Sequence, residues 1–260
     1  MMPKPEVSLV VPSYNTGDEI AETLDQLRAF FLRQSYTHEL IVVDDGSCDH
    51  TQTVLSRVTI GYPELRVLVN RGNMGKGFSV KRGALKATGA FVVYTDADLA
   101  YPIEEIEFLL EPLQQATHDI AMGSRVHPAS LFHIHPRHFR YVYKRHLMSR
   151  IFNYVVRVSF ALRAMDTQCG FKAFSAEAAK AIFPRVRLTG FAFDVEVLLI
   201  AQRLGLRMIE LPVTYRYNGE ISSVRMLQNG LQALIDLAKI YRWDRQGIYP
   251  RLCHGFSHRA

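Results

Sequence analysis

Residues 91–102 read FVVYTDADLAYP, and two carboxylates directly follow a run of apolar residues that favour β-strands. The apolar run, residues 91–95, is typical of a buried strand. Asp96 and Asp98 stand where this strand should end, separated by a single residue. Two interpretations are open at this point: polar residues of an ordinary loop, or paired oxygen ligands for Mg²⁺ or Mn²⁺. The residues at the ends of the other strands favour the metal ligands.

The N-terminal half of the chain predicts alternating strands and helices. Seven segments carry the apolar periodicity of such elements: strands at 7–11, 39–43, 65–69 and 91–95, and helices at 18–32, 51–58 and 77–87. Pro12 is expected to end the first strand, and residues 120–125 predict a further strand and turn. Apolar strands that alternate with helices favour an α/β fold, a mostly parallel sheet with helices on both faces.

Polar residues follow three of these predicted strands. The first ends in Pro-Ser-Tyr-Asn at residues 12–15, the second in Asp-Asp-Gly-Ser at residues 44–47, and the fourth in Asp96 and Asp98. Ligands of parallel sheets bind at the carboxyl ends of the strands, which meet at one edge. The convergence predicts a ligand site, and a metal ion there would neutralise a diphosphate leaving group. Residues 44–47 have two interpretations: their carboxylates contact the ligand, or they form a structural turn with glycine at its third position.

Charge is distributed unevenly along the chain. Residues 1–119 contain 10 Lys and Arg against 17 Asp and Glu, whereas residues 120–260 contain 21 against 8, for a total net charge of +6. Residues 120–165 contain no acidic residue but eight basic ones: Arg125, Arg137, Arg140, Lys144, Arg145, Arg150, Arg157 and Arg163. This basic segment predicts an anionic partner: a nucleic acid, a phosphorylated substrate or an acidic membrane surface.

Residues 139–163 combine basic residues with apolar residues at helical spacing, which predicts one or two amphipathic helices. A helix that lies in a membrane interface has this composition, although a core helix with a solvated basic face is the alternative. His133, His135 and His138 precede this segment among prolines, without carboxylate or thiolate neighbours, so they predict a solvated loop rather than a metal site.

The length and composition predict one domain over residues 1–245, followed by a tail at 246–260. Three cysteines form no even framework, which favours a reducing compartment. The N-terminus has no signal-peptide pattern, and Arg157 and Arg163 interrupt the longest apolar segment. We therefore expect a cytoplasmic protein held at a membrane surface, with a membrane partner protein as one means of attachment.

Seven motifs, PSYN, VDDGS, NMGKG, TDADL, GSR, DTQCGFK and FAFDVEVL, occur in this order between about residues 7 and 242. The set resembles the family 2 glycosyltransferases of the GT-A fold. Within them it is most similar to the polyprenyl-phosphate sugar transferases, the dolichyl-phosphate glucosyl- and mannosyltransferases. The resemblance implies a Rossmann-like sheet with C-terminal amphipathic helices, a nucleotide-sugar donor, a polyprenyl-phosphate acceptor and Mg²⁺ or Mn²⁺ as cofactor. It also implies that the domain has a nucleotide-sugar half at about 1–125 and an acceptor half, facing the membrane, at about 126–245.

The resemblance also implies a set of donor-side residues. Asp96 and Asp98 would hold the metal ion and the diphosphate, with Ala100 where mannosyltransferases commonly carry a further polar residue. The residues implied to line the nucleotide-sugar pocket are Pro12, Tyr14, Asn15, Asp44, Asp45 and Lys76.

On the acceptor side the resemblance implies a cationic cradle for the lipid phosphate. Arg125, Arg145 and Ser149 match its phosphate-contacting positions, and Gln168 matches a signature of the glucosyl branch. Arg216 is the second residue of a segment, residues 215–225, that resembles an acceptor loop. Val224 there replaces a common lysine, whose charge Arg225 would supply.

Several alternatives stay open from the sequence. A phosphate monoester is already anionic near neutral pH, so a lipid-phosphate acceptor requires no general base. A hydroxyl acceptor would require one, among Asp166, Asp194 and Glu196. UDP-glucose is the favoured donor over GDP-mannose because DTQCGFK and FAFDVEVL resemble the glucosyl branch. A nucleic-acid-binding protein is the alternative from another class, and the acidic strand ends and the lack of a recognisable motif disfavour it.

Overall fold

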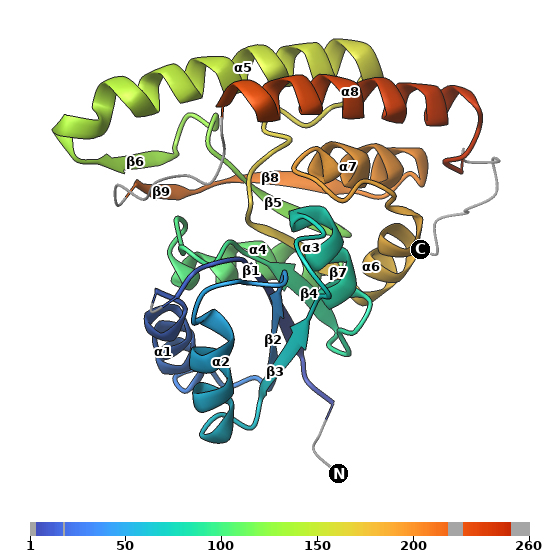
Figure 1. Cartoon of the computed structure of the whole chain (residues 1–260). Helices are drawn as coiled ribbons and strands as arrows, with labels where there is room; N and C mark the ends of the chain where they lie inside the picture. Colours follow the sequence, from blue (N-terminus) through green and yellow to red (C-terminus); the bar gives the residue numbers. More distant parts are fainter. Residues whose placement is uncertain (1–3, 18, 218–225, 251–260) are drawn as a thin grey trace.

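The computed structural model describes residues 4–17, 19–217 and 226–250, apart from the side chains of Arg145 and residues 226–230. Its centre is a seven-stranded sheet of order β3-β2-β1-β4-β7-β5-β8 (Figure 1). The strands are β1 (Val7–Ser13), β2 (His38–Asp44), β3 (Leu65–Val69), β4 (Phe91–Tyr94), β5 (Ile120–Ser124), β7 (Lys172–Ser175) and β8 (Met208–Pro212). Neighbouring strands are parallel except where β7 pairs with β4 and β5. The predicted mostly parallel α/β sheet is confirmed.

Helices cover both faces of this sheet. They are α1 (Glu19–Phe31), α2 (Thr51–Ile60), α3 (Lys76–Ala84), α4 (Ile106–Gln114), α5 (Phe139–Phe160), α6 (Ala176–Ile182), α7 (Phe193–Arg203) and α8 (Met226–Arg245). Alternate residues of β1 divide the core, since Val7, Leu9 and Val11 pack with α1, α2 and α4, whereas Val10 packs with α3, α6 and α7. In Figure 1, α5 and α8 run side by side above α7, outside this second layer.

Pro12 does not end the first strand as the sequence predicts. Strand β1 continues to Ser13, and Pro12 stands opposite Val43 of β2. The register of β1 with β4 stops at Val10, so the side of Pro12 that would carry an N–H faces no partner strand. The missing donor therefore leaves no ladder hydrogen bond unmade.

A second, two-stranded parallel sheet joins β6 (Leu131–Ile134) to β9 (Thr214–Tyr217). These strands follow β5 and β8 along the chain, and β6 places His133 opposite Arg216. The expected loop is therefore wrong at His133, because pairing with a distant strand decides its conformation. The imidazoles of His133, His135 and His138 line an open pocket of about 630 Å³.

The amphipathic stretch predicted at residues 139–163 forms one continuous helix, α5, of 22 residues. None of the helices in the described part of the chain is both long and apolar enough to span a membrane. In the expected tail, Tyr249 is 1% exposed and belongs to the hydrophobic core.

Candidate active site

Asp96 and Asp98 lie in a tight turn at the carboxyl end of β4. Asp96 is partly buried and Asp98 is exposed. One carboxylate oxygen of Asp98 accepts the backbone N–H of Ala100 at 3.0 Å, and Leu99 between them has a φ of 44°, a strained conformation for a branched residue. The Ala100 carbonyl accepts the N–H of Arg216 at 2.8 Å. Strand β9 therefore fixes the shape of the carboxylate turn.

The segment from Asp166 to Gly170 lies against this turn. A Cβ atom at Gly170 would overlap the Asp96 carboxylate, so any larger residue there would have to displace that carboxylate. Cys169 is fully buried, and burial raises the pKa of its thiol to about 11, which leaves little thiolate for a nucleophilic role. Gln168, between these contacts, is partly exposed. The segment from Asp166 to Gly170, which includes Gln168, is therefore in contact with the carboxylate turn at Asp96.

Lys76, the first residue of α3, reaches the same turn from the other side. Its Nζ lies 2.5 Å from Asp96 Oδ1, and the two side chains are 17% and 31% exposed. Burial by itself lowers the pKa of Lys76, but the carboxylates of Asp96, Asp194 and Asp98 outweigh it and raise that pKa above its ordinary value. The ammonium group is therefore charged at neutral pH.

Asp45 shapes the loop that leads into α3. Its carboxylate accepts the backbone N–H groups of Met74 at 2.9 Å and Gly75 at 2.7 Å, and the side-chain amide of Asn70 at 2.6 Å. Gly75 has a φ of 98°, and a Cβ there would lie 2.4 Å from the Thr189 carbonyl oxygen. The first backbone atoms of α3 are therefore held in one position.

Asp44 closes the turn at residues 44–47. It is fully buried and accepts the backbone N–H of Ser47 at 3.2 Å, the hydroxyl of Ser47 and the side-chain amide of Gln52 at 2.9 Å. The turn interpretation of this motif is therefore correct for Asp44. Contact of Asp44 or Asp45 with a nucleoside stays a prediction, and both carboxylates already hold loop backbone.

Pro12, Tyr14 and Asn15 lie at the end of β1, beside the loop that follows β2. The ring of Tyr14 is 38% exposed. Asn15 has a φ of 51°, which asparagine tolerates, and its Oδ1 accepts the N–H of Cys48 at 2.9 Å. Its own N–H donates to Ser47 Oγ at 2.9 Å. The two loops of the predicted nucleoside pocket are therefore bound to each other.

Arg125 forms a two-pronged ion pair with Asp166. Nε and Nη2 of Arg125 lie 2.7 and 2.8 Å from the two carboxylate oxygens, and the side chains are 17% and 1% exposed. Burial alone raises the pKa of Asp166, but the Arg125 guanidinium outweighs it and lowers that pKa to about 2. Any contact of Arg125 with an acceptor phosphate must use the atoms that this pair leaves exposed.

This pair makes acid stability a test of the site's structure. Because the pKa of Asp166 is lowered to about 2 on folding, its contribution is complete above the unfolded pKa and disappears as pH falls. We therefore compare the unfolding free energies of wild type and Asp166→Asn. The difference in favour of wild type is expected to shrink by about 1 kcal/mol when the pH falls from 5 to 3. Urea unfolding at both pH values measures this difference, and a pH-independent difference would contradict the assignment.

Two further groups hold the segment from Asp166 to Gly170. Asn153 of α5 accepts the N–H and the hydroxyl of Thr167 at 3.3 and 2.5 Å. The fully buried Lys172 donates its ammonium to the carbonyl oxygens of Cys169 and Thr167 and to the carboxylate of Asp194. The segment is thus fixed between α5, β7 and α7.

The remaining candidate bases are also engaged by neighbours. Asp194 accepts the hydroxyl of Tyr94 as well as the ammonium of Lys172. Glu196 accepts the backbone N–H groups of residues 187 and 188 and the hydroxyl of Tyr249. Burial raises the pKa of Glu196 despite these contacts. These bonds give both acids structural roles, as the ion pair does for Asp166.

The acceptor-side residues are only partly described. Arg145 and Ser149 belong to α5, where Ser149 is partly exposed, and the side chain of Arg145 is outside the described part. Arg216 is exposed on β9. Val224 and Arg225 lie outside the described residues. Contact of these residues with an acceptor stays a prediction.

Comparison with known proteins identifies the family. The model of glycosyl transferase family 2 matches residues 8–183. The chain belongs to this family. It is therefore a glycosyltransferase, and among curated relatives it is 32% identical over 252 residues to a dolichyl-phosphate beta-glucosyltransferase of Trichomonas vaginalis, covering 93% of this chain and 72% of the relative. Enzymes of the same name from Drosophila melanogaster and Homo sapiens are 36% and 33% identical, each covering 82% of this chain and 68% of the relative.

Solved structures of glycosyltransferases confirm the fold. A glucosyl-3-phosphoglycerate synthase of Mycobacterium tuberculosis in complex with UDP superimposes with a TM-score of 0.63 at 20% identity, over 92% of this chain and 80% of that one. A mannosyltransferase of Pyrobaculum calidifontis in complex with GDP-Man and Mn²⁺ gives 0.58 at 22% identity, over 93% and 65%. The GT-A architecture of this glycosyltransferase is therefore established.

The carboxylate turn has donors of the kind that a hard divalent cation prefers. Among the described residues no group of three or more His, Cys, Asp or Glu side chains could hold a metal ion. The side chain of Ala100 offers no ligand, and it is buried. An ion held by Asp96 and Asp98 would therefore complete its coordination with water and substrate oxygens, as Mg²⁺ commonly does.

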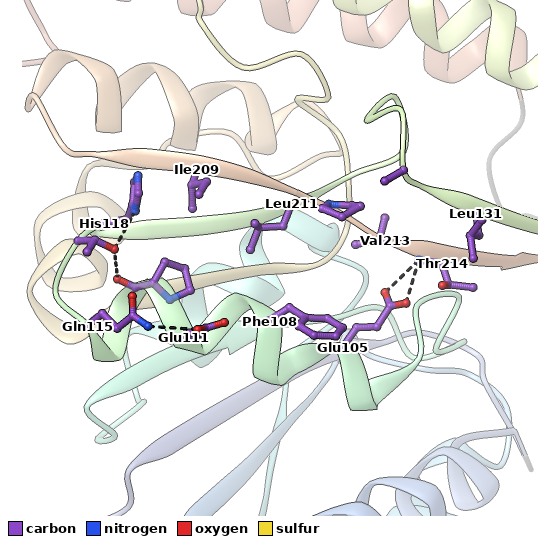
Figure 2. Close-up of a pocket in the computed structure, with 14 residues that line it drawn as sticks. Glu105, Phe108, Glu111, Gln115, His118, Leu131, Ile209, Leu211, Val213 and Thr214 are labelled. Carbon is purple, nitrogen blue, oxygen red and sulfur yellow. Dashed lines mark hydrogen bonds between the residues drawn. The ribbon is translucent and has the colours of Figure 1, made fainter.

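A groove of about 500 Å³ lies elsewhere, between α4 and the edge strand β8. Figure 2 shows Phe108, Leu211 and Val213 along it, with Glu105 bonded to the N–H of Thr214. None of the predicted site residues is among those that line it. We place the active site at the carboxyl ends of the strands because the charged groups converge there.

Sequence reasoning overlooked four residues that position this site: Asn70, Asn153, Gly170 and Lys172. All four are buried and act on the backbone or on charged partners. Lysine within an apolar strand pattern is the one signal that the sequence offered, because a fully buried lysine requires an acidic partner. The other three depend on contacts between distant segments.

Proposed function

We propose that this glycosyltransferase moves glucose from UDP-glucose to a polyprenyl phosphate of the dolichyl type, with inversion at the anomeric carbon. The names of the relatives, dolichyl-phosphate beta-glucosyltransferases, support this acceptor and sugar. The observation that carries the proposal is the contact between Gly170 and Asp96. Through this contact the segment from Asp166 to Gly170, which is hydrogen-bonded to Asn153 of α5, lies against the carboxylate turn that is implied to bind the donor.

The reaction forms a bond between the anomeric carbon and a phosphate oxygen of the acceptor while the bond to the UDP oxygen breaks. A phosphate monoester with a second pKa of about 6 is already an anion at neutral pH, so no side chain needs to remove a proton. This agrees with the structural roles of Asp166, Asp194 and Glu196, each of which is bound by partners inside the protein. Binding and alignment of the two substrates are the remaining tasks.

The chain's own residues divide these tasks. Asp96 and Asp98 would hold Mg²⁺ or Mn²⁺, and the bound ion would stabilise the charge on the departing diphosphate. On the donor side, Pro12, Tyr14 and Asn15 would contact the nucleoside. On the acceptor side, the basic residues Arg125, Arg145 and Arg216, together with Ser149 and Gln168, would position the phosphate and the sugar.

A donor and acceptor screen tests the proposed function. The protein is incubated with labelled UDP-glucose or GDP-mannose, polyprenyl phosphate and Mn²⁺, and label in the lipid phase is measured. We expect label from UDP-glucose. Label from GDP-mannose alone would make the protein a mannosyltransferase, and glycosylation of a soluble hydroxyl acceptor in place of the lipid would refute the lipid-phosphate assignment.

We further propose that α5 and α8 rest on the cytosolic surface of a membrane. Large apolar side chains on these helices are exposed: Phe139, Tyr143, Met148, Ile151, Tyr154 and Val158 of α5, and Leu231 and Leu234 of α8. Exposed basic residues stand among those of α5, namely Arg140, Lys144, Arg150 and Arg157. Apolar and basic side chains on one helical surface favour an interface rich in anionic lipid. A membrane partner protein would strengthen this attachment.

Replacing Ile151 and Tyr154 together by Glu is expected to reduce binding to vesicles that contain phosphatidylserine at least about tenfold. These side chains are 53% and 68% exposed, so their replacement should leave the core intact. The matched control is the double replacement of Leu32 and Ile60 by Glu, which adds the same charge at 76% and 88% exposed positions near α1 and α2. Flotation measures binding, and equal losses in the two variants would contradict the surface assignment.

A further inference from the structure

Lys76 stands where its backbone has little freedom. Asp45 accepts the two N–H groups that precede it, and Gly75 packs against the Thr189 carbonyl. The first turn of α3 contains no acidic residue, and a helix N-terminus disfavours a cation. The ammonium group is nevertheless held there, because Asp96 lies 2.5 Å away. The position of the Lys76 ammonium group therefore depends on the Asp96 carboxylate.

The net charge around this contact favours the binding of a divalent cation together with a diphosphate. The carboxylates of Asp96, Asp98 and Asp194 act on the Lys76 ammonium, and Lys172 pairs with Asp194, so the five groups carry a net charge of −1. A divalent cation added to this arrangement would make the net charge +1. A diphosphate with two negative charges would restore −1. The balance favours the metal ion and the diphosphate together over the metal ion alone.

We propose that Lys76 occupies Asp96 in place of the divalent cation while the donor is absent, and that it transfers to the donor diphosphate when the metal ion binds. The inference rests on the proposed function, since it assumes that Asp96 and Asp98 hold the metal. Lys76 and the metal ion compete for the same carboxylate oxygen. Once displaced, the ammonium group is within reach of a diphosphate held by the ion.

This competition couples the two ligands thermodynamically. In the wild type, metal binding without nucleotide must break the contact between Lys76 and Asp96. With UDP present the displaced ammonium gains a new anionic partner, so UDP strengthens metal binding. By linkage the metal ion strengthens UDP binding by the same factor. Removal of the ammonium group should weaken this coupling in two ways. It removes the competition for Asp96 without UDP, and it removes the contact with the diphosphate when UDP is bound.

Mn²⁺ binding measured by electron paramagnetic resonance tests the inference, because free Mn²⁺ gives the signal and no turnover is required. For Lys76→Met we expect the Mn²⁺ Kd without UDP to fall at least about fivefold relative to wild type. The ratio of the Kd values without and with saturating UDP should fall at least about tenfold. Lys76→Gln should behave alike and guards against a folding defect peculiar to Met.

Lys86→Met is the matched control, since it removes the same charge from an exposed position beyond α3 and should leave both Kd values unchanged. Asp96→Asn should abolish the binding and thereby assign it to this site. Equal or weaker Mn²⁺ binding by Lys76→Met without UDP would overturn the inference and leave the proposed function standing. Failure of every variant and of wild type to bind Mn²⁺, even with UDP, would instead refute the metal site of the proposed function and the inference with it.

Discussion

Replacing Asp98 by Ala is expected to lower the rate of glucose transfer at least about a hundredfold, because a metal ion that stabilises a leaving group contributes several kcal/mol. Asp98 is exposed, so its removal leaves no cavity in the core. The carboxylate also accepts the N–H of Ala100, and this bond shapes the turn. Transfer of labelled glucose to polyprenyl phosphate at saturating Mn²⁺ measures the loss.

Asp98→Asn separates the two roles of this carboxylate. Its amide oxygen still accepts the N–H of Ala100, whereas the negative charge is gone. We expect a loss nearly as large as that of the Ala variant, together with weaker Mn²⁺ binding. Asp25→Asn, an exposed neutralisation on α1, should retain wild-type activity. Activity of Asp98→Ala within tenfold of wild type would refute the metal assignment.

Replacing Lys172 by Met is expected to cost about 3–5 kcal/mol of unfolding free energy, the range for breaking a buried ion pair by removal of one partner. The side chain of Lys172 is 0% exposed and that of Asp194 is 4% exposed. The substitution leaves the buried Asp194 carboxylate with the hydroxyl of Tyr94 as its remaining hydrogen-bond partner in the described part of the chain, and it frees the carbonyl oxygens of Thr167 and Cys169. Urea unfolding monitored by circular dichroism measures the loss.

Neutralising the orphaned carboxylate should reverse much of this effect. In the double variant of Lys172→Met and Asp194→Asn no unpaired charge remains in the core, so we expect at least about half of the lost stability to return. Lys180→Met, which removes an exposed ammonium from α6, is the matched control and should change stability by less than about 0.5 kcal/mol. A loss below about 1 kcal/mol for Lys172→Met would contradict a stabilising ion pair.

The sequence was most informative where local pattern and physical chemistry agree. Apolar runs predicted β1 to β5, and helical periodicity predicted α1 to α3 and α5, with boundaries shifted by up to three residues. It was least informative at β7, a four-residue strand that enters the sheet antiparallel between β4 and β5. Its pairing depends on strands about fifty and eighty residues earlier, which no local pattern reveals.

The sequence by itself determined the α/β class, the placement of Asp96 and Asp98 at a strand end, and the separation of an acidic half from a basic one. These features follow from side-chain periodicity and charge, which are local properties of the chain. The tertiary structure decided which groups meet: Lys76 with Asp96, Gly170 with the same carboxylate, Arg125 with Asp166, and Lys172 with Asp194. Such pairs join segments that are separated in sequence, and only packing around a shared core brings them into contact.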